Sequence, residues 1–159
     1  MHCVSNTSST DLTALLSRYQ MQLVQVADHT DVPHSFWGAP EAGRAGSTLY
    51  VRADTPVHSL LHEACHYICM PSAQRRQAEV DAKGSVLEEN ACCYLQIILA
   101  DYIPGLNRHI LMYDMNCWGY SFRLGSTARW FFADCEETRQ WLIAHNILKH
   151  NNTPSWRLR

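Results

Sequence analysis

The feature that most constrains this chain is a His-Glu-x-x-His motif at residues 62–66, inside a segment whose residues favour a helix. Histidines four residues apart lie one turn apart on the same face of a helix, so His62 and His66 can both bind one metal ion. Glu63 projects from a neighbouring part of that helix and can orient a metal-bound water molecule. Zinc-dependent hydrolysis of a peptide bond is the reaction that this arrangement usually serves.

The residues on either side of the motif favour a helix. Asp54 followed by Pro56 is the usual order at a helix start, where a capping residue precedes a proline. Met70 before Pro71 favours an end, because a residue before proline is pushed out of the α region. Apolar residues recur between them at helical spacing, namely Val57, Leu60, Leu61, Ala64, Cys65 and Ile68. The motif therefore lies in the middle of a helix apolar enough to be central, although two ordinary histidines on an amphipathic helix would give the same five residues.

A catalytic zinc site needs a third protein ligand and an open coordination position. Cys69 and Ser72 stand where a metzincin-type motif requires glycine and histidine, which excludes that class. The alternative is a glutamate on a second helix, and residues 85–101 predict such a helix with Glu88 and Glu89 near its start. Glu88 falls within the apolar face of this helix. Because a buried carboxylate must be paired or bound to a metal, Glu88 is the preferred ligand.

Three alternatives to Glu88 remain. Ser85-x-x-Glu88 also fits a capping box, in which case Glu89 becomes the ligand. His58 lies one turn before His62 on nearly the same face, but three successive helical histidines do not easily surround one ion, so we expect His58 to support the site or the fold. His109 is the third ligand in a scheme with three histidines.

The residues Leu-His-Glu-Ala-Cys-His at 61–66 and Glu-Glu-Asn-Ala-Cys-Cys-Tyr-Leu at 88–95 resemble the ImmA/IrrE-type zinc peptidases, a gluzincin-like family. The family's second motif resembles a glutamate, an alanine three residues on and an aromatic residue three further; Glu88, Ala91 and Tyr94 take those places here. The resemblance covers about residues 48 to 104. It implies a small single-domain zincin-like fold, a zinc (Zn2+) cofactor and Glu88 as the third ligand.

Length and composition predict one domain over residues 1–150 with a C-terminal tail at 151–159. The chain has 159 residues, of which 47% are hydrophobic and 18% charged, as is ordinary for a globular protein. A net charge of −2 gives no basic surface for nucleic acid. No run approaches about 18 apolar residues and the N-terminus lacks an apolar signal core, so we expect a cytoplasmic protein without a membrane partner. Of the seven cysteines, Cys65, Cys69, Cys92 and Cys93 are expected to be small core residues where the two helices meet, and the alternative is a structural zinc site of cysteine and histidine.

The predicted fold class is α+β, with a short mixed sheet packed on the metal-binding helix and the glutamate-bearing helix. A first helix is expected at about residues 10–19, strands at 21–27 and 48–52, a turn-rich connection at 36–46 and a solvated loop at 71–84. A last helix is expected to begin at a capping box formed by Asp134 and Glu137. The 48–52 strand could form the rim of the cleft and pair with an extended peptide.

The predicted activity is that of a zinc metallopeptidase, a hydrolase with a narrow range of protein or peptide substrates. Zinc lowers the pKa of its bound water, and Glu63 as general base takes a proton from that water and delivers it to the leaving amine. The donor to the oxyanion is one of Tyr113, Tyr120, Arg123 and His109, which the sequence does not rank. The alternatives are a metal-binding regulatory or interaction protein without turnover, and a zinc amidohydrolase acting on a non-peptide substrate.

Overall fold

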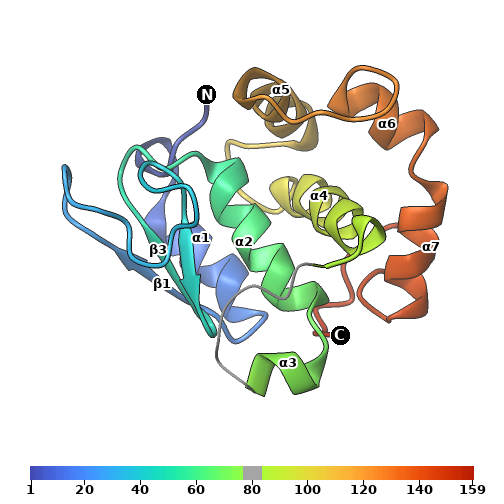
Figure 1. Cartoon of the computed structure of the whole chain (residues 1–159), viewed down its shortest axis with the longest axis horizontal. Coiled ribbons are helices and arrows are strands. Elements are labelled where there is room, and N and C mark those ends of the chain that lie inside the picture. Colours follow the sequence, from blue (N-terminus) through green and yellow to red (C-terminus); the bar gives the residue numbers. More distant parts are fainter. Residues whose placement is uncertain (77–83) are drawn as a thin grey trace.

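A small sheet and a set of α-helices lie on opposite sides of one central helix, α2 (Figure 1). The computed structural model describes residues 1–76 and 84–159. The described elements are the 3-10 helix η1 (Val4–Asn6), strands β1 (Gln22–Gln25), β2 (Gly43–Ala45) and β3 (Thr48–Val51), and helices α1 (Ser9–Ser17), α2 (Val57–Cys69), α3 (Ser72–Arg76), α4 (Val86–Ala100), α5 (Arg108–Trp118), α6 (Thr127–Ala133) and α7 (Glu136–Ala144). The α+β prediction is confirmed. Among the described residues, no helix has the length and apolar character needed to span a membrane.

Helix α2 is central because it is apolar on most of its circumference. Its side chains Val57, Leu60, Leu61, Ala64, Cys65 and Ile68 are completely buried, as their spacing predicted. The start of the helix differs from the prediction, since no side chain caps it. Asp54 forms an ion pair with Arg52 at 2.7 Å, and the backbone amide of Val57 donates to the carbonyl of His2. A long-range backbone contact therefore replaces the expected local cap.

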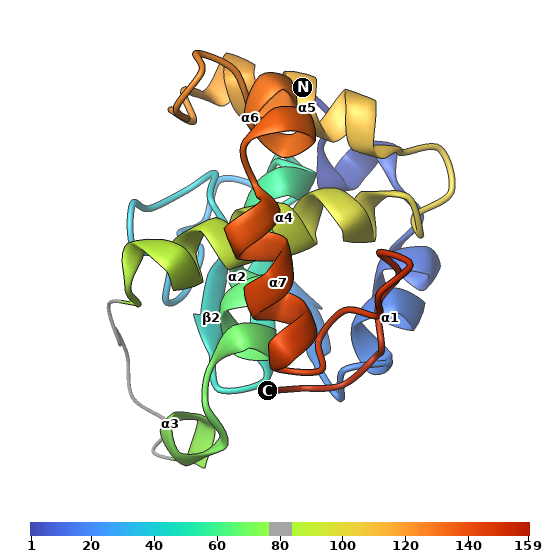
Figure 2. The same cartoon turned by 90° about the vertical axis from the view of Figure 1, so that its right-hand side faces the viewer.

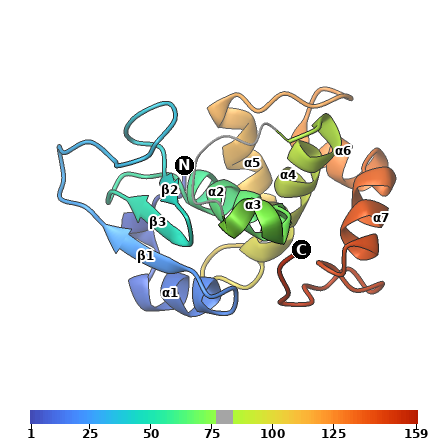
Figure 3. The ribbon, with the colours of Figure 1, turned by 60° about the horizontal axis from the view of Figure 1, so that its bottom comes forward.

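The three strands form a mixed sheet in the order β1-β3-β2. β1 runs parallel to β3, with Gln22 opposite Thr48, and β2 runs antiparallel to β3, with Gly43 opposite Tyr50 (Figure 3). The 48–52 strand is thus the central one among the described strands, so the prediction that it pairs with an extended peptide is wrong. The edge strands are β1 and β2, and β2 lies in the segment expected to be a turn-rich connection. Gly43 is required there because a Cβ would lie 1.9 Å from the carbonyl oxygen of Pro33.

Helix α4 packs across α2, and α5 and α7 cover its other sides (Figure 2). The buried cysteines Cys65, Cys69, Cys92 and Cys93 belong to these two packed helices, and all four are free thiols within the hydrophobic core. α5 and α6 occupy a region where the sequence indicated no helix. Asp134 pairs with Arg123 instead of capping α7, whose N-cap residue is Cys135.

Residues 151–159 are packed against the domain, so the expected tail is part of the fold. The guanidinium of Arg18 lies 4.1 Å from the ring centre of Trp156, and Tyr19 is another neighbour of that ring. The backbone amide of Arg159 donates to the carbonyl of Ile68 at 3.0 Å, near the end of α2. Helix α3 lies within the predicted 71–84 loop, and the part of that loop at 77–83 lies outside the described residues.

Candidate metal centre

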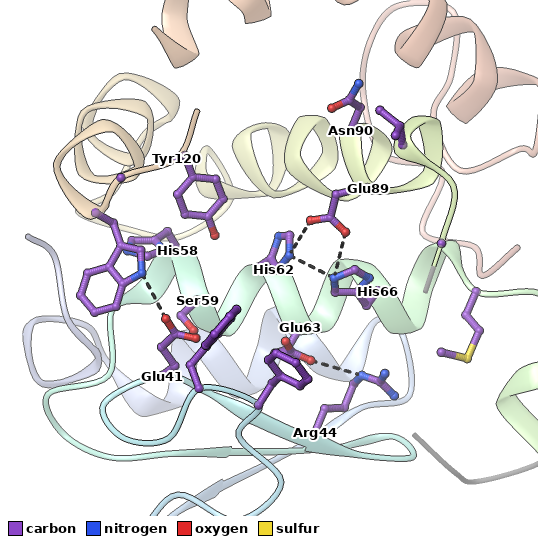
Figure 4. Close-up of a pocket in the computed structure, with 17 residues that line it drawn as sticks. Glu41, Arg44, His58, Ser59, His62, Glu63, His66, Glu89, Asn90 and Tyr120 are labelled. Carbon is purple, nitrogen blue, oxygen red and sulfur yellow. Dashed lines mark hydrogen bonds and ion pairs between the residues drawn. The ribbon is translucent and has the colours of Figure 1, made fainter. Parts of the chain in front are cut away.

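Two histidines of α2 and one glutamate of α4 converge on a common point (Figure 4). The Nε2 atoms of His62 and His66 are 3.0 Å apart. The Oε1 atom of Glu89 lies 3.1 Å from Nε2 of His62, and its Oε2 atom lies 3.5 Å from Nε2 of His66. The hydrogen bond with His62 holds the pKa of Glu89 below its usual range, so the side chain is a carboxylate. The two His residues of the motif and one of the two glutamates are thereby brought together.

These distances fit the coordination of one divalent metal ion. Nitrogen and oxygen ligands about 2.0–2.2 Å from a tetrahedral zinc ion are about 3.3–3.6 Å from one another. The separation of 3.5 Å between His66 and Oε2 of Glu89 lies in that range, and those of 3.0 and 3.1 Å are within about 0.3 Å of it. Two imidazoles and a carboxylate are also the donor set of a catalytic zinc site, with a fourth position left for water or substrate. His62, His66 and Glu89 are therefore the residues that could hold a metal.

Glu88, the preferred ligand from the sequence, points away from the histidines. Its carboxylate accepts a hydrogen bond from the backbone amide of Ser85 at 2.8 Å, which closes a capping box at the start of α4. It also pairs with Arg159 at 2.6 Å. The Ser85 amide, followed by Arg159, lowers the pKa of Glu88. The carboxylate of Glu88 is thus engaged by Ser85 at the helix start and by Arg159. Glu89, turned by about 100° around the helix, faces α2 instead.

The shift to Glu89 changes how the chain compares with the peptidase family named above. With Glu89 as the ligand, Cys92 and Leu95 stand where that family has an alanine and an aromatic residue. Comparison with models of known protein families, with curated proteins and with solved structures finds no match to this chain. The site therefore rests on its own geometry.

Two further residues of α4 contact the histidines, and the sequence reasoning missed both roles. Oε1 of Gln96 lies 2.7 Å from Nδ1 of His62, and Sγ of Cys92 lies 3.5 Å from Nδ1 of His66. A hydrogen bond at Nδ1 fixes the ring orientation and leaves Nε2 free to bind a metal. Residues 89, 92 and 96 share one face of α4, and this spacing was the signal for their roles.

Glu63, the second residue of the motif, does not join the three donors. Its carboxylate lies 3.7 Å from Nε of Arg44, a residue of β2 on the opposite wall of the cleft. Burial raises the pKa of Glu63 above its usual value, while His62 and Arg44 act in the opposite direction. A carboxylate whose pKa is raised toward neutrality, beside a metal site, has the properties of a general base.

The site opens into a cleft of about 900 Å³. Of the four candidate oxyanion donors, the structure brings only Tyr120 to this cleft, where its ring centre is 6.0 Å from that of His62. Tyr113 is two-thirds exposed, Arg123 is paired with Asp134, and the exposed His109 stacks against Phe132. His109 is therefore not a third ligand in this arrangement.

His58 is a buried packing residue. It is 1% exposed, and its ring lies 5.3 Å from that of Trp118 and 5.4 Å from that of Tyr120. Neither ring nitrogen has a hydrogen-bond partner among the described residues. Burial lowers the pKa of His58 to about 4, so the ring is neutral at physiological pH. His58 therefore packs beneath the cleft and does not reach the three donors.

Proposed function

We infer that this protein is a zinc metallopeptidase in which His62, His66 and Glu89 hold the metal and Glu63 is the general base. The observation that carries the proposal is that three potential metal ligands and a separate carboxylate face the same cleft. Three donors converge at metal-binding distances, while a fourth residue, Glu63, faces the same cleft without joining them. A purely structural zinc site is closed by four protein ligands and needs no adjacent base. The resemblance of the motif to gluzincin-like peptidases supports the same function.

The residues of the site have separate tasks in such a reaction. A zinc ion bound here lowers the pKa of water and polarises the carbonyl of the substrate. Glu63 accepts a proton from the water molecule that attacks the carbonyl carbon, and returns it to the amine released when the C–N bond breaks. The raised pKa of Glu63 suits both steps, because the group must gain and lose a proton near neutral pH.

Tyr120 is the best-placed donor to the oxyanion. Burial raises the pKa of its hydroxyl to about 12, so the group stays protonated and can donate a hydrogen bond. A preorganised donor of this kind stabilises the charged oxygen of the tetrahedral intermediate more strongly than the neutral carbonyl oxygen of the substrate.

The free edge of β2 offers a place for the substrate main chain. Gly43 and Arg44 lie on this edge strand, next to α2, and Arg44 lines the cleft beside Glu63. An extended peptide can add to such an edge as a further strand, which places its carbonyl groups along the cleft. The role first expected of the 48–52 strand thus passes to β2.

The test is hydrolysis of a complex peptide mixture by the full chain loaded with zinc, followed by mass spectrometry of the new termini. We expect cleavage by the natural sequence and none by Glu63→Gln, which should still bind close to one zinc per chain because the amide keeps the shape but not the base. Glu137→Gln, an exposed glutamate of α7, is the matched control and should cleave normally. Zinc bound without any cleavage would instead favour a metal-dependent regulatory protein, and cleavage unaffected by Glu63→Gln would contradict the assignment of the base.

A further inference from the structure

Three exposed aromatic side chains, and one carboxylate without a charged partner among the described residues, line the cleft. Phe36, Trp37 and Trp118 all line the cleft, although they are 69%, 78% and 38% exposed. The rings of Phe36 and Trp37 meet edge to face with centres 4.8 Å apart. Exposed aromatic side chains grouped at a cleft are a common sign of a binding surface, because their hydration is unfavourable. We call these three residues, together with Glu41, the aromatic–acid cluster.

Glu41 supplies the charge of this cluster. Its carboxylate accepts a hydrogen bond from the indole nitrogen of Trp118 at 3.2 Å, which links the two walls of the cleft (Figure 4). The other two carboxylates at the cleft have charged or histidine neighbours, since Glu63 lies beside Arg44 and Glu89 contacts the histidines. In the part of the chain that the structure describes, Glu41 forms no ion pair. A negative charge with only a neutral partner is therefore available to a ligand.

The charged member of the cluster is held close to α2. The backbone amide of Ala42, the residue after Glu41, donates to the hydroxyl of Ser59 at 3.0 Å in a buried contact. Ser59 is four residues before Glu63, so this contact lies about 6 Å along the helix from the general base. An extended peptide advances about 3.3 Å per residue, so a side chain bound beside Glu41 would lie within a few residues of the bond that is cut.

We propose that the aromatic–acid cluster binds a cationic side chain, arginine or lysine, of the peptide substrate close to the scissile bond. The proposal rests on the peptidase function proposed above and specifies its substrate class. Aromatic faces attract cations through their quadrupoles, most strongly for tryptophan. A carboxylate beside such faces adds attraction that an apolar side chain cannot use. An apolar side chain would leave Glu41 without a charged partner, and this argues for a cation over a leucine or phenylalanine.

The binding test does not depend on catalysis. The probes are acetyl-Gly-Arg-Gly-amide and its citrulline analogue, which has nearly the same shape without the charge, titrated into the full chain while the tryptophan indole N–H signals are followed by NMR. The arginine peptide should bind roughly three- to thirtyfold more tightly than the citrulline peptide and shift the signals of Trp37 and Trp118. Glu41→Gln should reduce this preference about two- to fivefold, and Trp37→Ala should weaken binding as well. Phe132→Ala, which removes an aromatic ring that is 61% exposed on α6, is the control and should change nothing.

The outcomes separate this proposal from the proposed function. Equal binding of both peptides, no binding of either, or tighter binding of a leucine analogue would overturn the cationic subsite. Peptide cleavage with arginine or lysine enriched at one position near the cut, and lost in Glu41→Gln, would support both proposals. Arginine-selective binding without any cleavage would leave the subsite standing and refute the peptidase. Cleavage without a preference for basic residues would leave the peptidase standing and refute the subsite.

Discussion

The adjacent glutamates of α4 are expected to respond in opposite ways to substitution by alanine. Glu88→Ala removes the carboxylate that completes the capping box with Ser85 and pairs with Arg159. Loss of a cap costs about 1 kcal/mol, and a partly exposed ion pair contributes about 0.2–1 kcal/mol. The free energy of unfolding should therefore fall by about 1–2 kcal/mol, which lowers Tm by about 2–8 °C for a domain of this size. Zinc binding should be retained.

Glu89→Ala should lower the stability of the metal-free protein only modestly, because this half-exposed carboxylate contacts His62 and His66. Its main effect should be seen when zinc is added. A ligand present at about 100 times its Kd stabilises a folded protein by about 2.7 kcal/mol, or about 5–10 °C in Tm. This increase should be seen in Glu88→Ala and be absent or much smaller in Glu89→Ala.

The assay is thermal unfolding of both variants in EDTA and in zinc, with the zinc content of the purified chains measured in parallel. Arg159→Ala is the control for zinc binding, since it removes the ion pair with Glu88 and the contacts of Arg159 with the Cys69 carbonyl and the Trp141 ring but keeps the capping box. It should keep the zinc-dependent increase in Tm. The reasoning would be refuted if Glu88→Ala lost the zinc-dependent increase in Tm while Glu89→Ala kept it. That result would return Glu88 to the role of third ligand.

Three other predictions follow from the site. Gln96→Leu removes the hydrogen bond to His62 and should weaken zinc binding about 10- to 100-fold in calorimetric titration. Tyr120→Phe should keep zinc but lower kcat about 100- to 1,000-fold, and full activity in this variant would exclude Tyr120 as the oxyanion donor. His58 has a folded-state pKa of about 4, below the unfolded value of about 6.5, so the unfolded state binds its proton first and stability should fall by up to about 3 kcal/mol between pH 6.5 and pH 4. Denaturant titrations at pH 7 and pH 5 should show a smaller decrease in His58→Phe.

The elements that bear the candidate metal ligands could be predicted because their signals are local. Helical spacing of apolar residues and the proline at position 71 predicted α2 between Pro56 and Met70, and it spans Val57–Cys69. The capping box at Ser85 predicted the start of α4. The same residue pattern gave Glu88 two compatible roles, as a cap and as a buried ligand. The contact that separates them, Arg159 against Glu88, joins residues 71 positions apart and has no local signal.

The sheet edge and the C-terminal segment could not be predicted for a related reason. β2 is three residues long and is a strand because it pairs with β3. Three residues are too few to show the alternation of apolar and polar side chains that would indicate a strand. The order of strands in the sheet depends on packing between distant segments. Residues 151–159 are held by Trp156 and Arg159 against α1, α2 and α4, and neither residue differs in local pattern from one in a free tail.

One residue of α4 nevertheless indicates which face of this helix packs against α2. From Ala91 to Ala100 every residue of this helix is buried, so burial alone does not tell which side meets α2. Gln96 is among them with 0% exposure, and a fully buried amide requires a polar partner. The α2 side chains with a strong donor or acceptor are the three histidines, Ser59, Glu63 and Tyr67. Among them the partner of Gln96 is His62, at 2.7 Å. A glutamate seven residues before Gln96 shares its face after nearly two turns, and that residue is Glu89. The buried glutamine therefore indicates the candidate third ligand more directly than the apolar face does, because it needs a polar partner whereas an apolar residue can pack on any side.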